Sequence, residues 1–435
     1  MSEELSSSFS IRTKLGGTVS SPQFLAEGGQ GYVYRVTYNG QEKALKWYKP
    51  GSIVNKSAFY DNIWQNVMRG SPSEEFLWPV DVTEEQDGTF GYVMDLRPEG
   101  YYEVTDFMLC HVRFQGYKTA IDAAMKIVSA FRKLHNAGYS YQDLNDGNFF
   151  INPINGKVLI CDNDNVAPDK TETGIVGKPR YMAPEIVMRE HMPDSLSDRF
   201  SMSVILYMLF CLNHPLEGKR YLVPGLTPEL QEKLYGSEPL FIMDPDDDSN
   251  GPHPRVHQNS IMVWNCLPEY MKDIFLDAFS QKALHHPTAR PKEIDWLNAL
   301  TRFRSDIVVC AKCGNEIFTH QGVPCACDQC GAMPSIPVRI TLSAYSIPAV
   351  KDSRLYRCQL GVCSEKEALS PVAQVVEKKN APGVLGIRNK SGKNWNAITS
   401  KGTAKKVLPD EVVPLKAGIT FTVFDEPVKL EANGR

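Results

Sequence analysis

Two carboxylates and an amide stand near one another in the middle of the chain, at a spacing that could support chemistry. Asp143 is followed five residues later by Asn148 and, fourteen residues after that, by Asp162, just past the apolar run Val158-Leu159-Ile160. A carboxylate can accept the proton of a hydroxyl group, and carboxylate and amide oxygens are ligands for hard metal ions. Because Asp and Asn are also frequent in turns, the meaning of these three residues depends on what precedes and follows them.

A glycine-rich turn lies upstream of these residues. The segment from Leu25 to Tyr34 is typical of a strand, a turn and a returning strand. Gly28 and Gly31 would let backbone N–H groups close over phosphate oxygens, because glycine has no Cβ. Lys46 follows thirteen residues after Val33 on an apolar strand, and the hairpin signal Asn39-Gly40 lies between them. A glycine turn alone would predict only a hairpin, but the turn and the lysine together favour a phosphate-binding site.

This combination resembles the eukaryotic-type, or Hanks-type, protein kinase family. The resemblance implies an α+β, bilobal kinase-like fold that uses ATP and Mg²⁺. It implies that Asp143 orients and deprotonates a substrate hydroxyl, that Asn148 and Asp162 bind Mg²⁺, and that Lys46 pairs the α- and β-phosphates. It assigns the nucleotide site to Ala26, which replaces the usual first glycine, and to Gly28, Gly31, Val33, Ala44, Lys46, Met94, Asp95 and Arg97.

Further landmarks follow in the order of that family. Residues 177–185 resemble the end of an activation segment and close on Ala183-Pro184-Glu185, residues 197–202 resemble the start of a buried central helix, and residues 286–291 resemble a late motif that contains Arg290. The resemblance implies an Arg290–Glu185 ion pair and a platform for a protein substrate. We expect the kinase-like region over residues 18–305, with a small lobe over 18–96, a large lobe over 97–305 and a flexible N-terminus over 1–17.

Three substitutions depart from the family pattern. Gln142 replaces the arginine that pairs a phosphorylated activation loop, so a switch through that salt bridge is not expected. Asn145 replaces the lysine that contacts the γ-phosphate in serine/threonine kinases. Asn163-Asp164 replaces Phe-Gly, and Asp164 could be a second carboxylate on the metal or a cap of the local turn.

The helix expected over residues 58–68 contains no glutamate that could pair with Lys46. Asp61 is the only acid in it and is one methylene shorter. Lys46 could pair with Asp61, or weakly with Asn62, or it could rely on Asp162 and on phosphate. The sequence leaves these alternatives open.

Eleven cysteines need an explanation other than disulfides, and the pattern after residue 309 supplies one. Cys310-Ala311-Lys312-Cys313-Gly314 and Cys327-Asp328-Gln329-Cys330-Gly331 are two C-x-x-C-G turns separated by thirteen residues. In each, the glycine lets the chain fold under a metal ion while backbone N–H groups point at the thiolates. We expect a four-thiolate zinc ribbon over residues 306–334, with Cys325 as an alternative ligand. A redox pair is the competing interpretation.

The last segment, residues 335–435, has a β pattern. Short β-branched runs at 338–342, 384–388, 412–415 and 419–424 are bounded by Gly, Pro, Asn and Asp, which favours a small antiparallel sandwich. Residues 389–395 and 413–419 resemble the second half of a forkhead-associated domain, without the Gly-Arg and Ser-x-x-His residues that would bind phosphothreonine. We expect this module and the ribbon to recruit a protein partner.

Composition fits two or three domains of a cytoplasmic protein, since no apolar run is long enough to span a bilayer and the N-terminus lacks the pattern of a signal peptide. Residues 301–435 contain 19 Lys and Arg against 12 Asp and Glu, but these cations are dispersed, so nucleic-acid binding is not expected.

The favoured function is an ATP- and Mg²⁺-dependent serine/threonine protein kinase, similar to divergent bacterial kinases of the Hanks type. A pseudokinase scaffold and a small-molecule phosphotransferase are the alternatives. The latter would not need the platform that Ala183, Pro184, Glu185 and Arg290 build.

Overall fold

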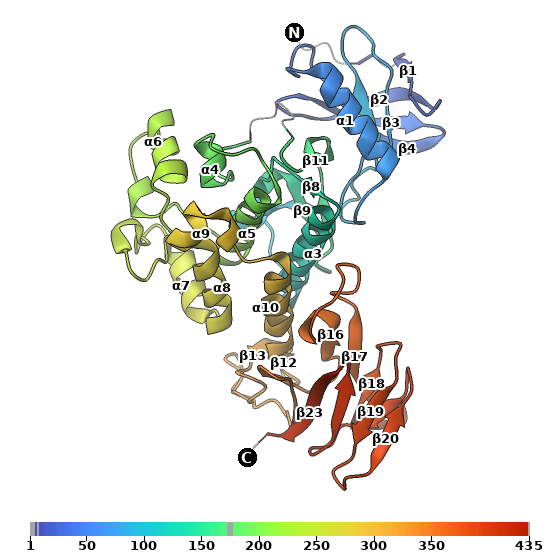
Figure 1. Ribbon diagram of the computed structural model, residues 1–435, viewed down its shortest axis with the longest axis vertical. Coiled ribbons are helices and arrows are strands. Elements are labelled where there is room, and N and C mark those ends of the chain that lie inside the picture. Colours follow the sequence, from blue (N-terminus) through green and yellow to red (C-terminus); the bar gives the residue numbers. More distant parts are fainter. Residues whose placement is uncertain (1–4, 7, 172–176, 434–435) are drawn as a thin grey trace. The chain divides into compact units, whose positions relative to one another are not determined.

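A computed structural model describes residues 5–6, 8–171 and 177–433 (Figure 1). The chain divides into two compact units. The first contains Met1–Phe114, Ala130–Leu267 and Phe275–Pro291, and the second contains Gln115–Ser129, Pro268–Ile274 and Lys292–Arg435. Within the described residues, no helix combines the length and apolar character needed to cross a membrane.

The first unit begins with a six-stranded antiparallel sheet in the order β1-β2-β3-β4-β6-β5. The hairpin predicted at Asn39-Gly40 joins β3 to β4, and both turn residues have positive φ, 49° and 79°. Helix α1 buries Phe59 and Ile63 with Tyr48 of β4 and with Phe90, which precedes β6, and it confirms the helix expected over residues 58–68. The bounds are β1 Ser10–Arg12, β2 Thr18–Glu27, β3 Gly31–Tyr38, β4 Gln41–Tyr48, α1 Lys56–Arg69, β5 Asp81–Val82 and β6 Gly91–Met94.

The described part of the N-terminal segment, residues 5–6 and 8–17, differs from the flexible stretch expected over residues 1–17, of which residues 1–4 and 7 lie outside the described residues. β1 pairs with β2 in register Ile11↔Val19, and Phe9 and Ile11 are buried in the sheet's hydrophobic cluster. Phe9 also packs edge-on against Trp47, with ring centroids 5.3 Å apart. Burial of these two apolar side chains orders the segment, although a short run between polar residues gave no signal for it.

The remainder of the first unit is mainly helical around α5. Predicted from residues 197–202 as a buried central helix, α5 is confirmed: it begins after Asp194, whose carboxylate accepts the N–H groups of Leu196 and Ser197, and its side chains from Phe200 to Cys211 are all buried. The bounds are β7 Tyr102–Glu103, α2 Val104–Met108, α3 Tyr117–Asn136, β8 Tyr139–Ser140, β9 Phe149–Ile151, β10 Val158–Ile160, β11 Ala167–Pro168, α4 Pro184–Val187, α5 Ser195–Cys211, α6 Pro228–Glu232, α7 Gln258–Cys266, α8 Glu269–Phe279 and α9 Gln281–His285. The first part of α3 and of α8 belongs to the second unit.

The second unit also contains α10, a two-stranded hairpin and two antiparallel sheets. The sheets have the orders β15-β14-β23-β22-β19-β20 and β16-β17-β18-β21, and they share one hydrophobic cluster around Trp395 and Phe421, whose rings stack at 4.7 Å. The bounds are α10 Glu293–Asp306, β12 Ile307–Val309, β13 Glu316–Phe318, β14 Val338–Thr341, β15 Ser346–Pro348, β16 Arg354–Tyr356, β17 Pro371–Lys378, β18 Ala381–Asn389, β19 Trp395–Ile398, β20 Ala404–Val407, β21 Val412–Pro414, β22 Thr420–Val423 and β23 Glu426–Ala432.

A buried carboxylate at the end of α10 predicts how the second unit responds to pH. Burial raises the pKa of Asp306 to about 7, against the hydrogen bond that the Tyr270 hydroxyl donates to Oδ2 at 2.8 Å. Between pH 4 and 7 the folded chain therefore holds a proton that the unfolded chain releases, so stability falls as pH rises through this window.

Replacing Asp306 by asparagine should raise stability at pH 8, by on the order of 3 kcal/mol, and change it little at pH 4. Thermal unfolding midpoints of both proteins at these two pH values test the expectation. A variant that is equally shifted at both values would show that ionisation of Asp306 is not the cause.

Candidate active site

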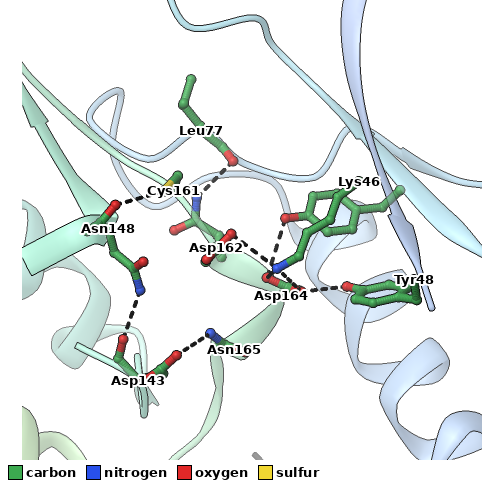
Figure 2. A network of polar contacts seen from close by, with 12 residues as sticks. Lys46, Tyr48, Leu77, Asp143, Asn148, Cys161, Asp162, Asp164 and Asn165 are labelled. Carbon is green, nitrogen blue, oxygen red and sulfur yellow. Dashed lines mark hydrogen bonds and ion pairs between the residues drawn. The ribbon is translucent and has the colours of Figure 1, made fainter. Parts of the chain in front are cut away.

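A short hairpin brings Asn148 and Asp162 together. β9 and β10 pair in register Phe149↔Ile160, so the residue before β9 and the residues after β10 lie side by side. The Cys161 N–H donates to the Asn148 carbonyl at 3.0 Å and closes this end of the hairpin (Figure 2). The apolar side chains of the two strands fix the amide and the second carboxylate at one edge.

The buried carboxylate of Asp198 holds the loop that carries Asp143. Asp198, in the first turn of α5, accepts the Tyr141 N–H at 2.6 Å and His135 Nε2 at 3.1 Å. Its side chain is only 3% exposed. Sequence reasoning gave Asp198 no role, although an aspartate in the first turn of an otherwise apolar helix was a usable signal.

Asp143 itself is placed as a proton acceptor. Its backbone carbonyl accepts Asn148 Nδ2 at 2.9 Å, and its Oδ2 accepts Asn165 Nδ2 at 3.4 Å. Burial raises the pKa of Asp143 to about 6, assisted by the negative charge of Asp162 and opposed by the positive charges of Lys178 and Lys46. A base with a pKa in this range is ionised at neutral pH and can take a hydroxyl proton.

Lys46 reaches two carboxylates from one short segment. Its Nζ lies 3.1 Å from Asp162 Oδ1 and 2.9 Å from Asp164 Oδ2, as Figure 2 shows. Burial works to lower the pKa of Lys46, but the two carboxylates outweigh it and hold the pKa above its ordinary value. The ammonium group therefore stays charged in a buried position.

Asp164 is a buried anion for Lys46. Its carboxylate is fully buried, and it also accepts hydrogen bonds from the hydroxyls of Tyr48 and Tyr92, the latter at 3.3 Å. Of the alternatives for Lys46, Asp61 is exposed on α1 and makes no such contact among the described residues. Asp164 is thus the partner that sequence reasoning did not consider for Lys46. The described residues that donate to its carboxylate, Lys46, Tyr48 and Tyr92, lie on strands β4 and β6.

Helix α1 contacts the same segment through amides instead of a charge. Asn62 Nδ2 and Asn66 Nδ2 both donate to the Val166 carbonyl, at 2.9 and 2.8 Å. Asn163, which replaces the expected phenylalanine, is buried and donates to the carbonyls of Leu77 and Ile160 at 2.8 and 2.9 Å. The turn η2, Asn163–Asn165, is thereby tied to the rest of the unit through main-chain acceptors.

Strand register places the residues assigned to the nucleotide. Ala26 pairs with Val33, Val33 with Lys46, and Ala44 with Met94, so these side chains occupy neighbouring rungs of one sheet. Asp95 and Arg97 follow β6; the Asp95 carboxylate is ion-paired with Lys43, and the Arg97 guanidinium lies 3.9 Å from the centre of the Phe150 ring.

The two glycines also have structural roles in the turn. A Cβ on Gly31 would lie 2.4 Å from the Trp47 carbonyl oxygen, so glycine is required for β3 to approach β4. The Gly28 N–H donates to the Gly31 carbonyl at 2.8 Å and closes the turn. In this conformation the Gly28 N–H is engaged by the turn itself, and contact of the glycine turn with phosphate stays a prediction.

Hydrogen bonds and one ion pair hold the described parts of the segment that follows η2. Gln142, with φ of 68°, donates from Nε2 to the Thr171 carbonyl at 3.0 Å. Arg180 forms a fork with Glu217, with Nη2 3.1 Å from Oε2, and Lys178 Nζ donates to Asn145 Oδ1 at 3.2 Å. Thr171 and Thr173 are the residues of this segment considered as phosphorylation positions, and Thr173 lies outside the described residues.

This arrangement predicts that phosphatase treatment leaves activity nearly unchanged. Gln142 cannot form a bidentate pair with phosphate, and the Arg180 guanidinium is already occupied by Glu217. Phosphate transfer measured before and after complete dephosphorylation, verified by intact mass, is the test. A tenfold or greater loss would mean that another cation reads a phosphorylated residue.

The predicted ion pair between Glu185 and Arg290 is confirmed. Both contacts of the bidentate pair are 2.7 Å, and Arg290 Nη1 also donates to the Leu196 carbonyl at 2.9 Å. Both side chains are buried, at 8% and 1% exposed. Removing one partner of a buried ion pair destabilises a folded protein by about 3–5 kcal/mol. The pair therefore fixes α4 at the end of the segment that resembles an activation segment.

Four cysteine thiols converge in the second unit. The Sγ atoms of Cys310, Cys313, Cys327 and Cys330 all lie within 4.8 Å of one another, with Cys310–Cys330 at 3.6 Å and Cys313–Cys327 at 3.5 Å. Desolvation opposes ionisation of Cys327, but the N–H groups of Cys330 and Gln329 lower its pKa to about 6. Gly314 and Gly331 have positive φ, as the turns require, and the group could hold a metal ion. Cys325, the alternative ligand, instead donates to the Phe318 carbonyl at 2.9 Å.

Comparison with known proteins gives a consistent answer for the first half of the chain. Residues 20–226 match the protein kinase domain family. The chain is 29% identical over 203 residues to calcium-dependent protein kinase 20 of Oryza sativa subsp. japonica, an alignment that covers 45% of this chain and 33% of the relative. It is 29% identical over 127 residues to serine/threonine-protein kinase sck2 of Schizosaccharomyces pombe, covering 26% of this chain and 19% of that protein.

The matches are partial, and the chain spans about a third of the length of the first of these relatives. Their sources are a plant and a yeast, so they give no support to the bacterial origin expected from the sequence. Among solved structures, the kinase domain of Mycobacterium tuberculosis PknI is matched with a TM-score of 0.44 and 18% identity, over 68% of this chain and 98% of that one.

The site residues and the family match concern the same region. Lys46, Asp143, Asn148 and Asp162 all lie within residues 20–226 and meet at one place in the first unit. The region that matches the protein kinase domain family therefore contains all four of these side chains.

Proposed function

We propose that this protein is an ATP- and Mg²⁺-dependent kinase that phosphorylates serine or threonine hydroxyls of a protein substrate. The observation that carries the proposal is the meeting of Asp143, Asn148, Asp162 and Lys46 from three separate segments. Asn148 Nδ2 donates to the Asp143 carbonyl, so its Oδ1 is the atom left to serve as a metal ligand beside the carboxylate of Asp162. This set of hard oxygen donors fits Mg²⁺, which would neutralise phosphate charge when bound.

The reaction follows from the roles of these side chains. Lys46 would hold the α- and β-phosphates, and Asp143 would orient the acceptor hydroxyl and receive its proton. The acceptor oxygen forms a bond to the γ-phosphorus as the bond between that phosphorus and the β,γ-bridging oxygen breaks, and ADP leaves. Positioning and charge neutralisation supply most of the barrier reduction in such transfers.

A groove beside the base supports a polypeptide acceptor. It has a volume of about 620 Å³, and its wall includes Gln142, Gly177, Met182 and Ile186. The same four residues line a smaller hollow that reaches Asp143. An extended segment in the groove could present a hydroxyl to Asp143, whereas a small-molecule kinase would not need this surface. The name of the yeast relative supports serine or threonine as the acceptor.

The test is transfer of labelled γ-phosphate from Mg·ATP to the protein itself and to a generic basic protein. Wild type should label its substrate and Asp143→Asn should not. Binding of Mg·ATP without any transfer by wild type would instead support a pseudokinase scaffold.

We further propose that the four thiols hold one zinc ion and that the second unit recruits a protein partner. Zinc bonded to four sulfurs at about 2.3 Å requires S–S separations of about 3.8 Å, close to those of Cys310–Cys330 and Cys313–Cys327 at 3.6 and 3.5 Å. The segment between the first and last pairs of ligands, residues 314–326, has few large apolar residues, and the two β sheets beyond it would form an interaction module of the sandwich type.

Replacing Cys313 or Cys327 by serine should lower the zinc content from one ion per chain to near zero. Few apolar residues support this segment without a metal, so it should become sensitive to proteolysis. Elemental analysis and limited proteolysis measure the two effects, with Cys325→Ser as the matched control that keeps both zinc and protection. Wild type purified without chelator and free of zinc would contradict the metal site.

A further inference from the structure

Lys178 lies over the loop that carries the proposed base. Its Nζ donates to Asn145 Oδ1 at 3.2 Å. Asn145 is buried, and its side chain is fixed from two other directions, by donation to the Asp143 carbonyl at 3.1 Å and by acceptance of the Gly147 N–H at 3.2 Å. The lysine head is therefore held by a preformed acceptor, two residues from Asp143.

Around the proposed transfer point, carboxylates outnumber the cations that pair with them, so the site can accommodate a second cation. Asp143, Asp162 and Asp164 place three carboxylates at the site, and Lys46 is committed to the latter two. The transferred phosphoryl group carries negative charge on its equatorial oxygens, and enzymes stabilise it with cations on the side of the acceptor as well as of the nucleotide. Lys178 is exposed, so its head is accessible to a substrate from that side.

We propose that Lys178 is a catalytic residue that binds the transferring γ-phosphoryl group, with Asn145 as the positioning residue that holds its ammonium. Residue 145 is where the family resemblance expects a lysine for this contact. The chain would supply the same charge from residue 178, and the amide at 145 makes space for it. This inference rests on the proposed kinase function.

The first experiment compares binding of Mg·AMP-PNP and Mg·ADP by calorimetry to wild type and to Lys178→Met, which keeps the aliphatic stem. Affinity for Mg·AMP-PNP should fall about tenfold and affinity for Mg·ADP should stay the same, because only the former has a γ-phosphoryl group. Lys282→Met, an exposed lysine on α9, is the matched control and should change neither affinity. Equal effects on both nucleotides, or no effect, would overturn the inference.

The second experiment measures turnover and includes a rescue. Lys178→Met should lower kcat about a hundredfold, as loss of one stabilising group does in other active sites, with a smaller change in KM for ATP. The double variant Asn145→Lys with Lys178→Met should recover at least tenfold, since the charge returns from the neighbouring residue. A wild type that transfers phosphate while Lys178→Met stays within twofold of it would sink the inference and leave the kinase function intact. A wild type without transfer whose AMP-PNP preference still depends on Lys178 would support the contact and reject the kinase function.

Discussion

Replacing Asp162 by alanine should lower kcat by about a thousandfold or more while the protein stays folded. Asp162 is both a proposed metal ligand and a partner of Lys46, with its Oδ1 3.1 Å from Nζ, so one change removes two sources of charge organisation. Its side chain is 37% exposed, so it contributes little to the core and its loss leaves packing unchanged. Single-turnover transfer at saturating Mg·ATP, beside a thermal unfolding curve, separates catalysis from stability.

Asp273→Asn, an exposed carboxylate on α8, is the control for general effects of charge removal and should keep full activity. Asp143→Asn should lose activity to a comparable degree through the base. Full activity in Asp162→Ala would exclude the metal role, and activity lost together with the folding transition would show that the residue is structural.

Replacing Asp164 by asparagine should lower kcat/KM about a hundredfold and destabilise the protein. The change keeps the shape of the side chain but leaves the buried Lys46 with Asp162 as its one remaining carboxylate partner among its described contacts. A buried charge that loses a partner typically costs about 3–5 kcal/mol, here reduced by the partner that stays. Asp61→Asn on α1 is the matched control and should behave as wild type, because that carboxylate is exposed.

A relocation variant tests the assignment more sharply. Asp164→Gly with Asn62→Glu would move the carboxylate from η2 to α1, where Asn62 Nδ2 already lies 3.5 Å from the Asp164 carbonyl. Partial recovery of kcat/KM over Asp164→Gly alone is expected. An Asp164→Asn variant that is as stable and active as wild type would show that Lys46 depends on Asp162 alone.

Local patterns predicted the parts of the site that chain topology alone brings together. Asn148 and Asp162 flank an apolar hairpin, so their proximity follows from β9 pairing with β10. The role of Asp164 does not follow in this way, because its contact with Lys46 joins residues 118 apart and depends on which way one side chain points. Tyr92 of β6 pairs with Lys46 of β4. A tyrosine opposite that lysine was the remaining sequence signal for the role of Asp164.

The second unit shows the same limit. Strands over 338–342 and 419–424 were found because β-branched residues dominate them, and β14 and β22 confirm them. β17 and β23 were missed, since Gln374 interrupts the apolar residues of β17, and Lys429 and Glu431 interrupt those of β23. In β23, however, buried Val428 and Leu430 alternate with more exposed positions. This period of two indicates a strand even where the composition does not.

Helix α1 contacts the active-site segment through two side-chain amides, and these bind the backbone of the segment and not the carboxylate that pairs with Lys46. Asn62 and Asn66 both donate to the Val166 carbonyl, a main-chain atom whose position depends on the turn at 163–165. The helix therefore follows the turn and does not hold the anion that steadies Lys46. A partner that displaced α1 would have to break the hydrogen bonds to the Val166 carbonyl, but it would remove no charged group from the site. Here the helix would serve as an indicator of whether the turn has formed, and Trp64 on α1 offers an intrinsic fluorophore with which to read it.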